Sequence, residues 1–157
     1  MKYFRKLIGI RGIYMIYTTL TKKALKICFN AHKDQVDKSG LPYVFHPFHL
    51  AEQMNSEDEV CVALLHDVVE DTDITFEDLE KEGFNNKVID ALKLLTHDDD
   101  TPYMEYVKKI KLNDIARKVK LADLKHNTDL TRLDLTFQQI PYKYDTYKEA
   151  ISYLESE

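Results

Sequence analysis

The chain has 157 residues, of which 44% are hydrophobic and 31% are charged, and its formal net charge is −5. This size and composition fit one soluble globular domain, and only four Gly and four Pro argue against a turn-rich β architecture. The acidic balance argues against a sequence-independent binder of nucleic-acid polymers, because such proteins carry a basic surplus.

The first residues combine a basic start with an apolar middle, as secretion signals do. Arg11 interrupts the apolar run, no small-residue cleavage site follows, and the segment is too short and too charged to span a bilayer. We therefore predict a cytoplasmic protein without a membrane partner. Met15 offers a second start, so residues 1–14 are interpreted as an N-terminal extension and residues 15–157 as the domain. Cys28 and Cys61 lie within apolar helical patterns, which predicts buried thiols in a reducing compartment.

Apolar residues recur with helical spacing along most of the chain, and no segment alternates with the period of a strand. Thr19 or Thr21 can cap the first helix, and a turn signature follows at 39–42. A capping box at 75–78 and the pair at 113–114 predict two further helix starts. The fold class is therefore predicted to be all-α, with about seven or eight helices in one domain. The predicted helices cover about 22–33, 57–70, 75–83, 86–95 and 142–154, and others start near 46, 101 and 113.

The stretch from Val60 to Asp73 is both the most apolar and the most unusual part of the chain. Six apolar residues run into His66-Asp67 and then Glu70-Asp71. On a helix, residues four apart share a face, which places His66 beside Glu70 and Asp67 beside Asp71. Buried carboxylates repel one another unless they are protonated or paired. A divalent cation would resolve this, and the mixed nitrogen and oxygen ligands suit zinc, iron or manganese. The alternative is a helix end that leaves the core with its acidic turn in water.

Two residues elsewhere are candidates for the same chemistry. His46 lies where a turn enters a helix, a rigid position from which to orient a ring. Asp123 lies among apolar neighbours, where a carboxylate needs Lys120, a helix cap or a metal. Asn127 is four residues further on and shares its face.

Four segments, all in one order, carry a family resemblance. They are AHKDQ at 31–35, KSGLPYVFHP at 38–47, ALLHDVVEDT at 63–72 and KLADLKHN at 120–127. The chain resembles the HD-type metal-dependent phosphohydrolases and, more narrowly, the hydrolase domain of the RelA/SpoT alarmone family. The resemblance spans about residues 20–134 and implies an HD-domain helical bundle that acts as a stand-alone small alarmone hydrolase.

The resemblance also implies an activity and the residues that perform it. The expected reaction removes pyrophosphate from the 3′ position of guanosine tetra- or pentaphosphate and leaves GDP or GTP. A divalent metal, usually Mn²⁺, would be held by His46, His66, Asp67 and Asp123, while Glu70 and Asp71 would position and deprotonate the attacking water. The expected substrate contacts are His32, Lys38 and Asn127, and the phosphate candidates near Asp123 are Lys120 and Lys125.

Two positions depart from the family pattern. Family members carry an arginine that helps to grip the guanine where this chain has Asp37, and often a second arginine where it has Asp129. An acidic side chain makes no cation–π contact with a base and repels phosphate. These departures leave two alternatives: a phosphohydrolase of another nucleotide or phosphorylated cofactor, and a non-catalytic nucleotide-binding sensor. The second is disfavoured because all four expected ligands and the Glu-Asp pair are present.

Overall fold

A computed structural model describes residues 15–98, 100–132 and 143–156; the predicted extension at 1–14 lies outside these residues. Within the described residues the backbone forms nine α-helices and an isolated β-bridge between Val36 and Pro42, which confirms the prediction of an all-α fold. The helices are α1 (Thr19–His32), α2 (Phe45–Glu52), α3 (Glu57–Leu65), α4 (Val68–Asp71), α5 (Phe76–Lys81), α6 (Asn86–Leu95), α7 (Tyr103–Lys111), α8 (Asp114–Asn127) and α9 (Tyr144–Glu155), with a 3₁₀ turn, η2 (Leu130–Arg132), after α8.

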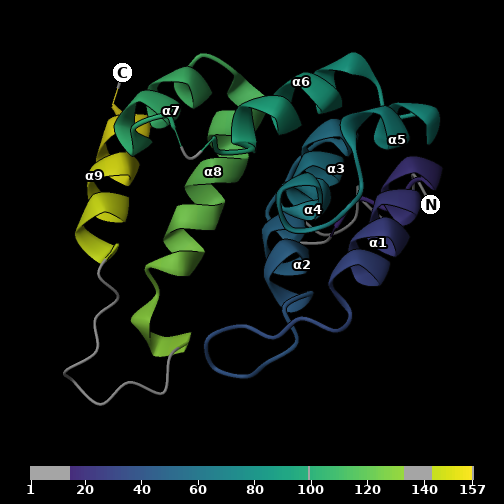
Figure 1. Cartoon of the computed structure of the whole chain (residues 1–157), viewed down its shortest axis with the longest axis horizontal. Helices are drawn as coiled ribbons and strands as arrows, with labels where there is room; N and C mark the ends of the chain where they lie inside the picture. The colour runs from purple at the N-terminus through teal and green to yellow at the C-terminus, as the bar shows by residue number, and fades with distance from the viewer. Residues whose placement is uncertain (1–14, 99, 133–142, 157) are drawn as a thin grey trace, which may run out of the picture.

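Helix α3 is the centre of the fold, as Figure 1 shows, and it packs against α1, α2, α6 and α8. Its six residues from Val60 to Leu65 are all buried, so neighbours cover it on every side. Burying side chains of this size stabilises the fold by roughly 1.5–3 kcal/mol each. Ser56 caps the start of the helix, since its hydroxyl accepts the N–H of Glu59, and the other end of the helix is buried.

The prediction of one helix over 57–70 is wrong, because α3 ends at Leu65 and a separate short helix, α4, begins at Val68. The ring of His66 lies at the break, and its Nδ1 is 2.8 Å from the carbonyl oxygen of Ala63. A side chain that bonds a nearby carbonyl competes with the backbone ladder, which accounts for the turn. The break places His66 and Asp67 at the junction of two helices instead of along one face.

Several helix starts follow the predicted capping signals. Thr75 and Asp78 form the reciprocal capping box of α5, and the side chain of Asn113 accepts the N–H of Ala116 at the start of α8. The first helix differs by one position, because Thr18 is its cap and Thr21 completes the box. Thr21 thus takes part in the cap without being the cap itself.

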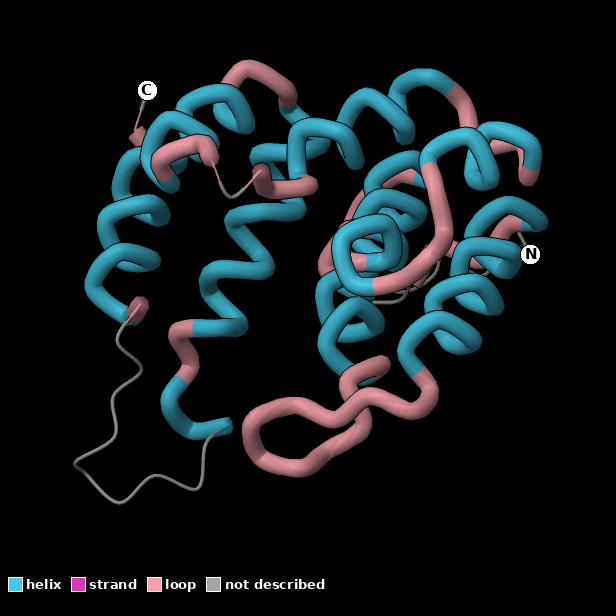
Figure 2. The backbone as a smooth tube through the Cα atoms, viewed as in Figure 1, coloured by secondary structure: helices cyan, strands magenta, loops and turns pink. Residues whose placement is uncertain are grey.

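Helix α8 connects the two sides of the domain. It packs against α2 and α3 on one side and against α7 and α9 on the other. Figure 2 shows the long loop between α1 and α2 reaching η2, the turn after α8, where the hydroxyl of Ser39 donates to the carbonyl of Arg132 over 2.9 Å. Among the described helices, none combines the length and apolar character needed to cross a bilayer.

Candidate functional site

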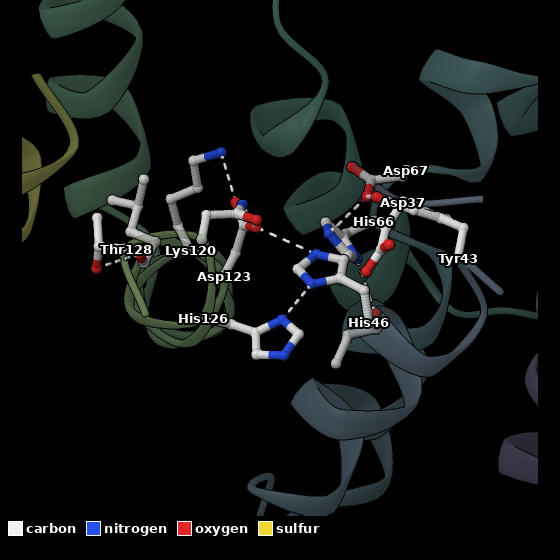
Figure 3. Close-up of polar contacts among 12 residues, drawn as sticks. Asp37, Tyr43, His46, His66, Asp67, Lys120, Asp123, His126 and Thr128 are labelled. Carbon is white, nitrogen blue, oxygen red and sulfur yellow. Dashed lines mark hydrogen bonds and ion pairs between the residues drawn. The ribbon is translucent and has the colours of Figure 1, made fainter. Parts of the chain in front are cut away.

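Three side chains from three helices converge beside the buried end of α3. His46 comes from the first turn of α2, His66 follows α3, and Asp123 comes from α8; each has one potential ligand atom within 4.8 Å of the others. Figure 3 shows the ring of His46 between Asp123 on one side and His66 on the other. The Nε2 atom of His46 is 3.2 Å from Oδ1 of Asp123. All three residues are at most 5% exposed, so the group is a buried polar cluster in an apolar core.

Asp67 adjoins this cluster. Its Oδ2 is 2.9 Å from Nε2 of His66 and also accepts a hydrogen bond from the hydroxyl of Tyr43. The Nδ1 atom of His66 is committed to the carbonyl of Ala63, whereas its buried Nε2 has no partner with hydrogen-bond geometry. The structure therefore places a buried imidazole nitrogen, which makes no hydrogen bond of good geometry, 2.9 Å from the carboxylate of Asp67.

The charges of the cluster favour a cation. Burial alone would lower the pKa of His66, but the carboxylates of Asp67 and Asp123 outweigh it and raise that pKa to about 9. Burial would raise the pKa of Asp67, but His66 opposes it and holds that pKa at about 2. Two carboxylates beside buried imidazoles therefore make the cluster an environment that attracts positive charge.

Asp123 is oriented by two neighbours on its own helix. Its Oδ2 accepts from Lys120 over 2.8 Å, and its Oδ1 accepts from Asn127 over 2.6 Å. Lys120 is also 5.4 Å from the ring centroid of Tyr106, and the charge of Asp123 raises its pKa well above the usual value despite burial. Lys120 and Asn127, both predicted as substrate contacts, thus hold a predicted metal ligand in place.

Two residues at the cluster were not singled out from the sequence. Tyr43 bonds Asp67, and His126 places its Nδ1 2.6 Å from Nδ1 of His46. Burial, together with the charges of His46, Arg132 and His49, lowers the pKa of His126 to about 3, so its ring is neutral. Helical spacing could have indicated His126, because it lies three residues after Asp123 and therefore on the same face.

The predicted catalytic pair on α4 divides between two environments. Glu70 accepts the backbone N–H of His97 over 3.1 Å, which ties it to the loop after α6. Asp71 is exposed, and partial burial together with the charge of Asp67 raises its pKa. Asp71 therefore combines solvent access with a raised pKa.

The other predicted substrate residues lie at different distances from the cluster. His32 is fully buried; its Nδ1 is 2.8 Å from Gln35, its Nε2 has no partner, and its ring packs on Tyr43. Lys38 is exposed in the loop before α2. Lys125 pairs with Glu155 of α9 over 2.6 Å, so the structure does not bring it to the cluster.

The two acidic departures from the family pattern have local partners. Oδ1 of Asp37 accepts the N–H groups of Ser39 and Leu41, while its Oδ2 lies 3.4 Å from Arg132. Oδ1 of Asp129 accepts both the N–H and the hydroxyl of Thr131. Both carboxylates therefore stabilise local turns, one in the loop before α2 and one after α8.

A divalent metal fits this arrangement on its own chemistry. Two imidazole nitrogens with one or two carboxylates form the mixed donor set of manganese, iron and zinc sites, and Nε2 of His66 has no competing partner. An all-α domain in which a histidine, a His-Asp pair and a distant aspartate meet is the HD-type metal-dependent phosphohydrolase fold.

Comparisons with known proteins narrow this class. The chain is 33% identical over 129 residues to the guanosine-3′,5′-bis(diphosphate) 3′-pyrophosphohydrolase MESH1 of Danio rerio, and the match covers 73% of this chain and 71% of that protein. It is 33% identical over 121 residues to the bifunctional (p)ppGpp synthase/hydrolase SpoT of Escherichia coli, where the match covers 68% of this chain but 17% of SpoT. None of the family models compared with the chain matches it.

The fold agrees with these relatives. A solved structure described as a metazoan ortholog of SpoT that hydrolyses ppGpp superposes with a TM-score of 0.73 at 26% sequence identity, covering 90% of this chain and 89% of that one. The chain belongs to the family of guanosine-3′,5′-bis(diphosphate) 3′-pyrophosphohydrolases, which confirms the resemblance carried by its four segments.

Proposed function

We propose that the chain hydrolyses guanosine-3′,5′-bis(diphosphate) and its pentaphosphate counterpart at the 3′ position. The observation that carries the proposal is the convergence of His46, His66 and Asp123, which lie far apart in sequence, within 4.8 Å. Family membership and the similarity to MESH1 along 71% of its length support the same substrate. The free, buried thiols of Cys28 and Cys61 are compatible with action in a reducing compartment such as the cytoplasm.

His46, His66, Asp67 and Asp123 are the proposed ligands, and Mn²⁺ is the proposed ion. When bound, such an ion polarises a phosphoryl oxygen and lowers the pKa of water. Lys120 and Asn127 act through Asp123, because both of its oxygens accept hydrogen bonds from them. Tyr43 acts similarly on Asp67. These outer contacts fix the orientation of the ligands before the ion arrives.

Asp71 is the proposed base. A water molecule attacks the phosphorus attached to O3′, the P–O3′ bond breaks, and the proton lost by the water passes to Asp71. The departing O3′ takes up a proton, so the products are pyrophosphate and GDP or GTP. The raised pKa of Asp71 strengthens it as a proton acceptor, while Glu70 is oriented by the N–H of His97.

Substrate contacts are proposed on the open side of the cluster. His32 has an unpartnered buried nitrogen beside Tyr43, and Lys38 extends from the exposed loop before α2. Asn127 has a second amide hydrogen available beyond the one given to Asp123. Lys125 contributes only long-range positive charge, because it is paired with Glu155.

A second candidate function is the hydrolysis of a different nucleotide or phosphorylated cofactor. The observation that favours it is Asp37, whose carboxylate lies in the loop next to the cluster and is paired with Arg132. With an acidic residue at this position, the loop presents no guanidinium group of its own to a base. A substrate with fewer negative charges or a different base would suit it better.

The decisive experiment is a hydrolysis panel with metal-free and Mn²⁺-loaded protein, using guanosine tetraphosphate, GTP, ATP and phosphorylated sugars. We expect pyrophosphate release from guanosine tetraphosphate only with metal. Asp71→Asn should lower kcat by about 10²-fold or more while metal affinity stays unchanged. The matched control is Asp73→Asn, since Asp73 is exposed two residues further on. Binding of the tetraphosphate without turnover would contradict catalysis, and faster turnover of another compound would establish the second candidate.

A further inference from the structure

His126 lies next to His46, on the side of the His46 ring that faces away from His66 (Figure 3). The two Nδ1 atoms are 2.6 Å apart, and the rings are nearly parallel, with centroids 4.9 Å apart at an angle of 16°. His49 stacks on His126, with ring centroids 4.4 Å apart. Figure 3 shows His126 on α8 directed at His46.

The short Nδ1 separation restricts where the protons lie. Two N–H groups cannot face each other at 2.6 Å, and two lone pairs would repel, so one ring donates and the other accepts. The other nitrogen of His46, Nε2, faces Oδ1 of Asp123 within the ligand cluster. A nitrogen that binds a metal must present a lone pair, so the proton of a ligating His46 lies on Nδ1.

We propose that His126 is a positioning residue for the metal centre: its Nδ1 accepts the proton of His46 Nδ1–H and thereby fixes His46 in the tautomer and orientation that direct Nε2 at the ion. This role rests on the metal site proposed above. It resembles the general arrangement in which a ligating histidine donates its second N–H to an acceptor that raises its basicity. Here the acceptor is a neutral imidazole instead of a carboxylate.

The surroundings of His126 hold it in this role. It lies on the same face of α8 as Asp123, so one helix supplies both a ligand and the acceptor for another ligand. The guanidinium of Arg132 donates to the carbonyl of His126 over 2.9 Å, which anchors the end of the helix. A shift of α8 would therefore move both contacts of His46 together.

Three variants separate hydrogen bonding from packing. His126→Phe keeps a ring for stacking but removes the acceptor, while His126→Asn places an amide oxygen near the position of Nδ1. His49→Phe is the matched control, since His49 stacks on His126 but makes no hydrogen bond to a proposed ligand in the described residues. The measurements are Mn²⁺ affinity by competition with a chelator, the His46 tautomer by long-range ¹H–¹⁵N spectra of protein loaded with diamagnetic Zn²⁺, and thermal unfolding.

We expect His126→Phe to lose about 10–100-fold in Mn²⁺ affinity and to lose the single Nδ1–H form of His46. His126→Asn should restore most of the affinity, and His49→Phe should match the wild type. Unchanged affinity in His126→Phe would overturn the role, as would equal losses in the Phe and Asn variants, which would indicate ring packing. Wild-type protein that binds no Mn²⁺ would overturn the proposed metal site together with this role, which distinguishes the two failures.

Discussion

The ligand cluster and the neighbouring loop between α1 and α2 both contain buried or half-buried acids, but they satisfy them differently. In the loop, Asp37 has two backbone N–H donors and Arg132, so its charge is balanced by the protein. In the cluster, Asp67 and Asp123 raise the pKa of His66 to about 9, and one buried nitrogen still has no partner. The loop is complete in itself, whereas the cluster is arranged for a positive ligand. We propose that the cluster determines the type of chemistry and that the loop influences which substrate reaches it.

The largest expected effect comes from removing Lys120, whose ammonium group pairs with the carboxylate of Asp123 in the cluster. Lys120→Met leaves the buried carboxylate of Asp123 without its ion pair, and we expect a loss of about 3–5 kcal/mol in the free energy of unfolding. Added Mn²⁺ should recover part of this loss, because the ion restores positive charge. Urea unfolding with and without Mn²⁺ measures both effects.

The matched control for that variant is Lys125→Met, which breaks the exposed pair with Glu155. We expect a change of no more than about 1 kcal/mol and no dependence on Mn²⁺. Equal losses in the two variants would mean that the cluster is no more dependent on positive charge than the surface of α8 is.

The next largest effect concerns Asp67, a partly exposed carboxylate beside the cluster. Asp67→Asn keeps the shape but removes the charge that contributes most to raising the pKa of His66, so this pKa should fall below about 9 in metal-free protein. Loss of a proposed ligand should also lower kcat/KM at least about 100-fold. NMR titration of the histidines measures the pKa of His66, and pyrophosphate release measures kcat/KM. A His66 pKa that does not move would show that Asp67 is not coupled to the cluster.

How much of the fold and of the cluster can be predicted from the sequence depends on whether the interactions involved are local or long-range. Local signals indicated the helices well, because caps such as Asn113 and the spacing of apolar residues act within a few residues. The break after Leu65 was missed because His66 bonds the Ala63 carbonyl, and propensity does not reveal that contact. The all-α fold and the family were predicted because four segments occur in one order.

The residues of the site could be predicted from the sequence, but the contacts that these residues make with their neighbours could not. His46, His66 and Asp123 were indicated by their residue types and the family resemblance, and the structure brings them together. The contacts of Tyr43 and Arg132 depend on how α2, α4 and α8 pack, which is tertiary information. The roles of the predicted catalytic and substrate residues stay predictions until the variants are measured.

A smaller effect sharpens the role of the loop. Asp37→Asn keeps an oxygen for the N–H groups of Ser39 and Leu41 but removes a negative charge near the path of a polyphosphate. We expect KM for guanosine tetraphosphate to fall several-fold, equivalent to about 1 kcal/mol, with kcat unchanged. Asp90→Asn, on the exposed face of α6, is the control for net charge. Identical KM values for the two variants would show that Asp37 has no specific influence on substrate binding.

The smallest expected effect concerns Glu59, a carboxylate outside the site that is paired with Lys118. Burial raises the pKa of Glu59, but hydrogen bonds from Lys118 and the N–H of Asn55 outweigh it and lower the pKa overall. A lowered folded-state pKa contributes stability above the unfolded pKa, and this contribution disappears as pH falls through the folded value. Glu59→Gln should therefore cost up to about 1 kcal/mol at neutral pH, and the difference should fade below about pH 4. Denaturant unfolding at several pH values checks the trend, and Mn²⁺ should not alter it.

The most direct single measurement is the titration of chelator-treated protein with Mn²⁺ while pyrophosphate release from guanosine tetraphosphate is followed. The account predicts no release without metal and a rise in rate that saturates when one ion is bound by each chain. Release at full rate from metal-free protein, or a rate that stays at zero once the ion is bound, would contradict it.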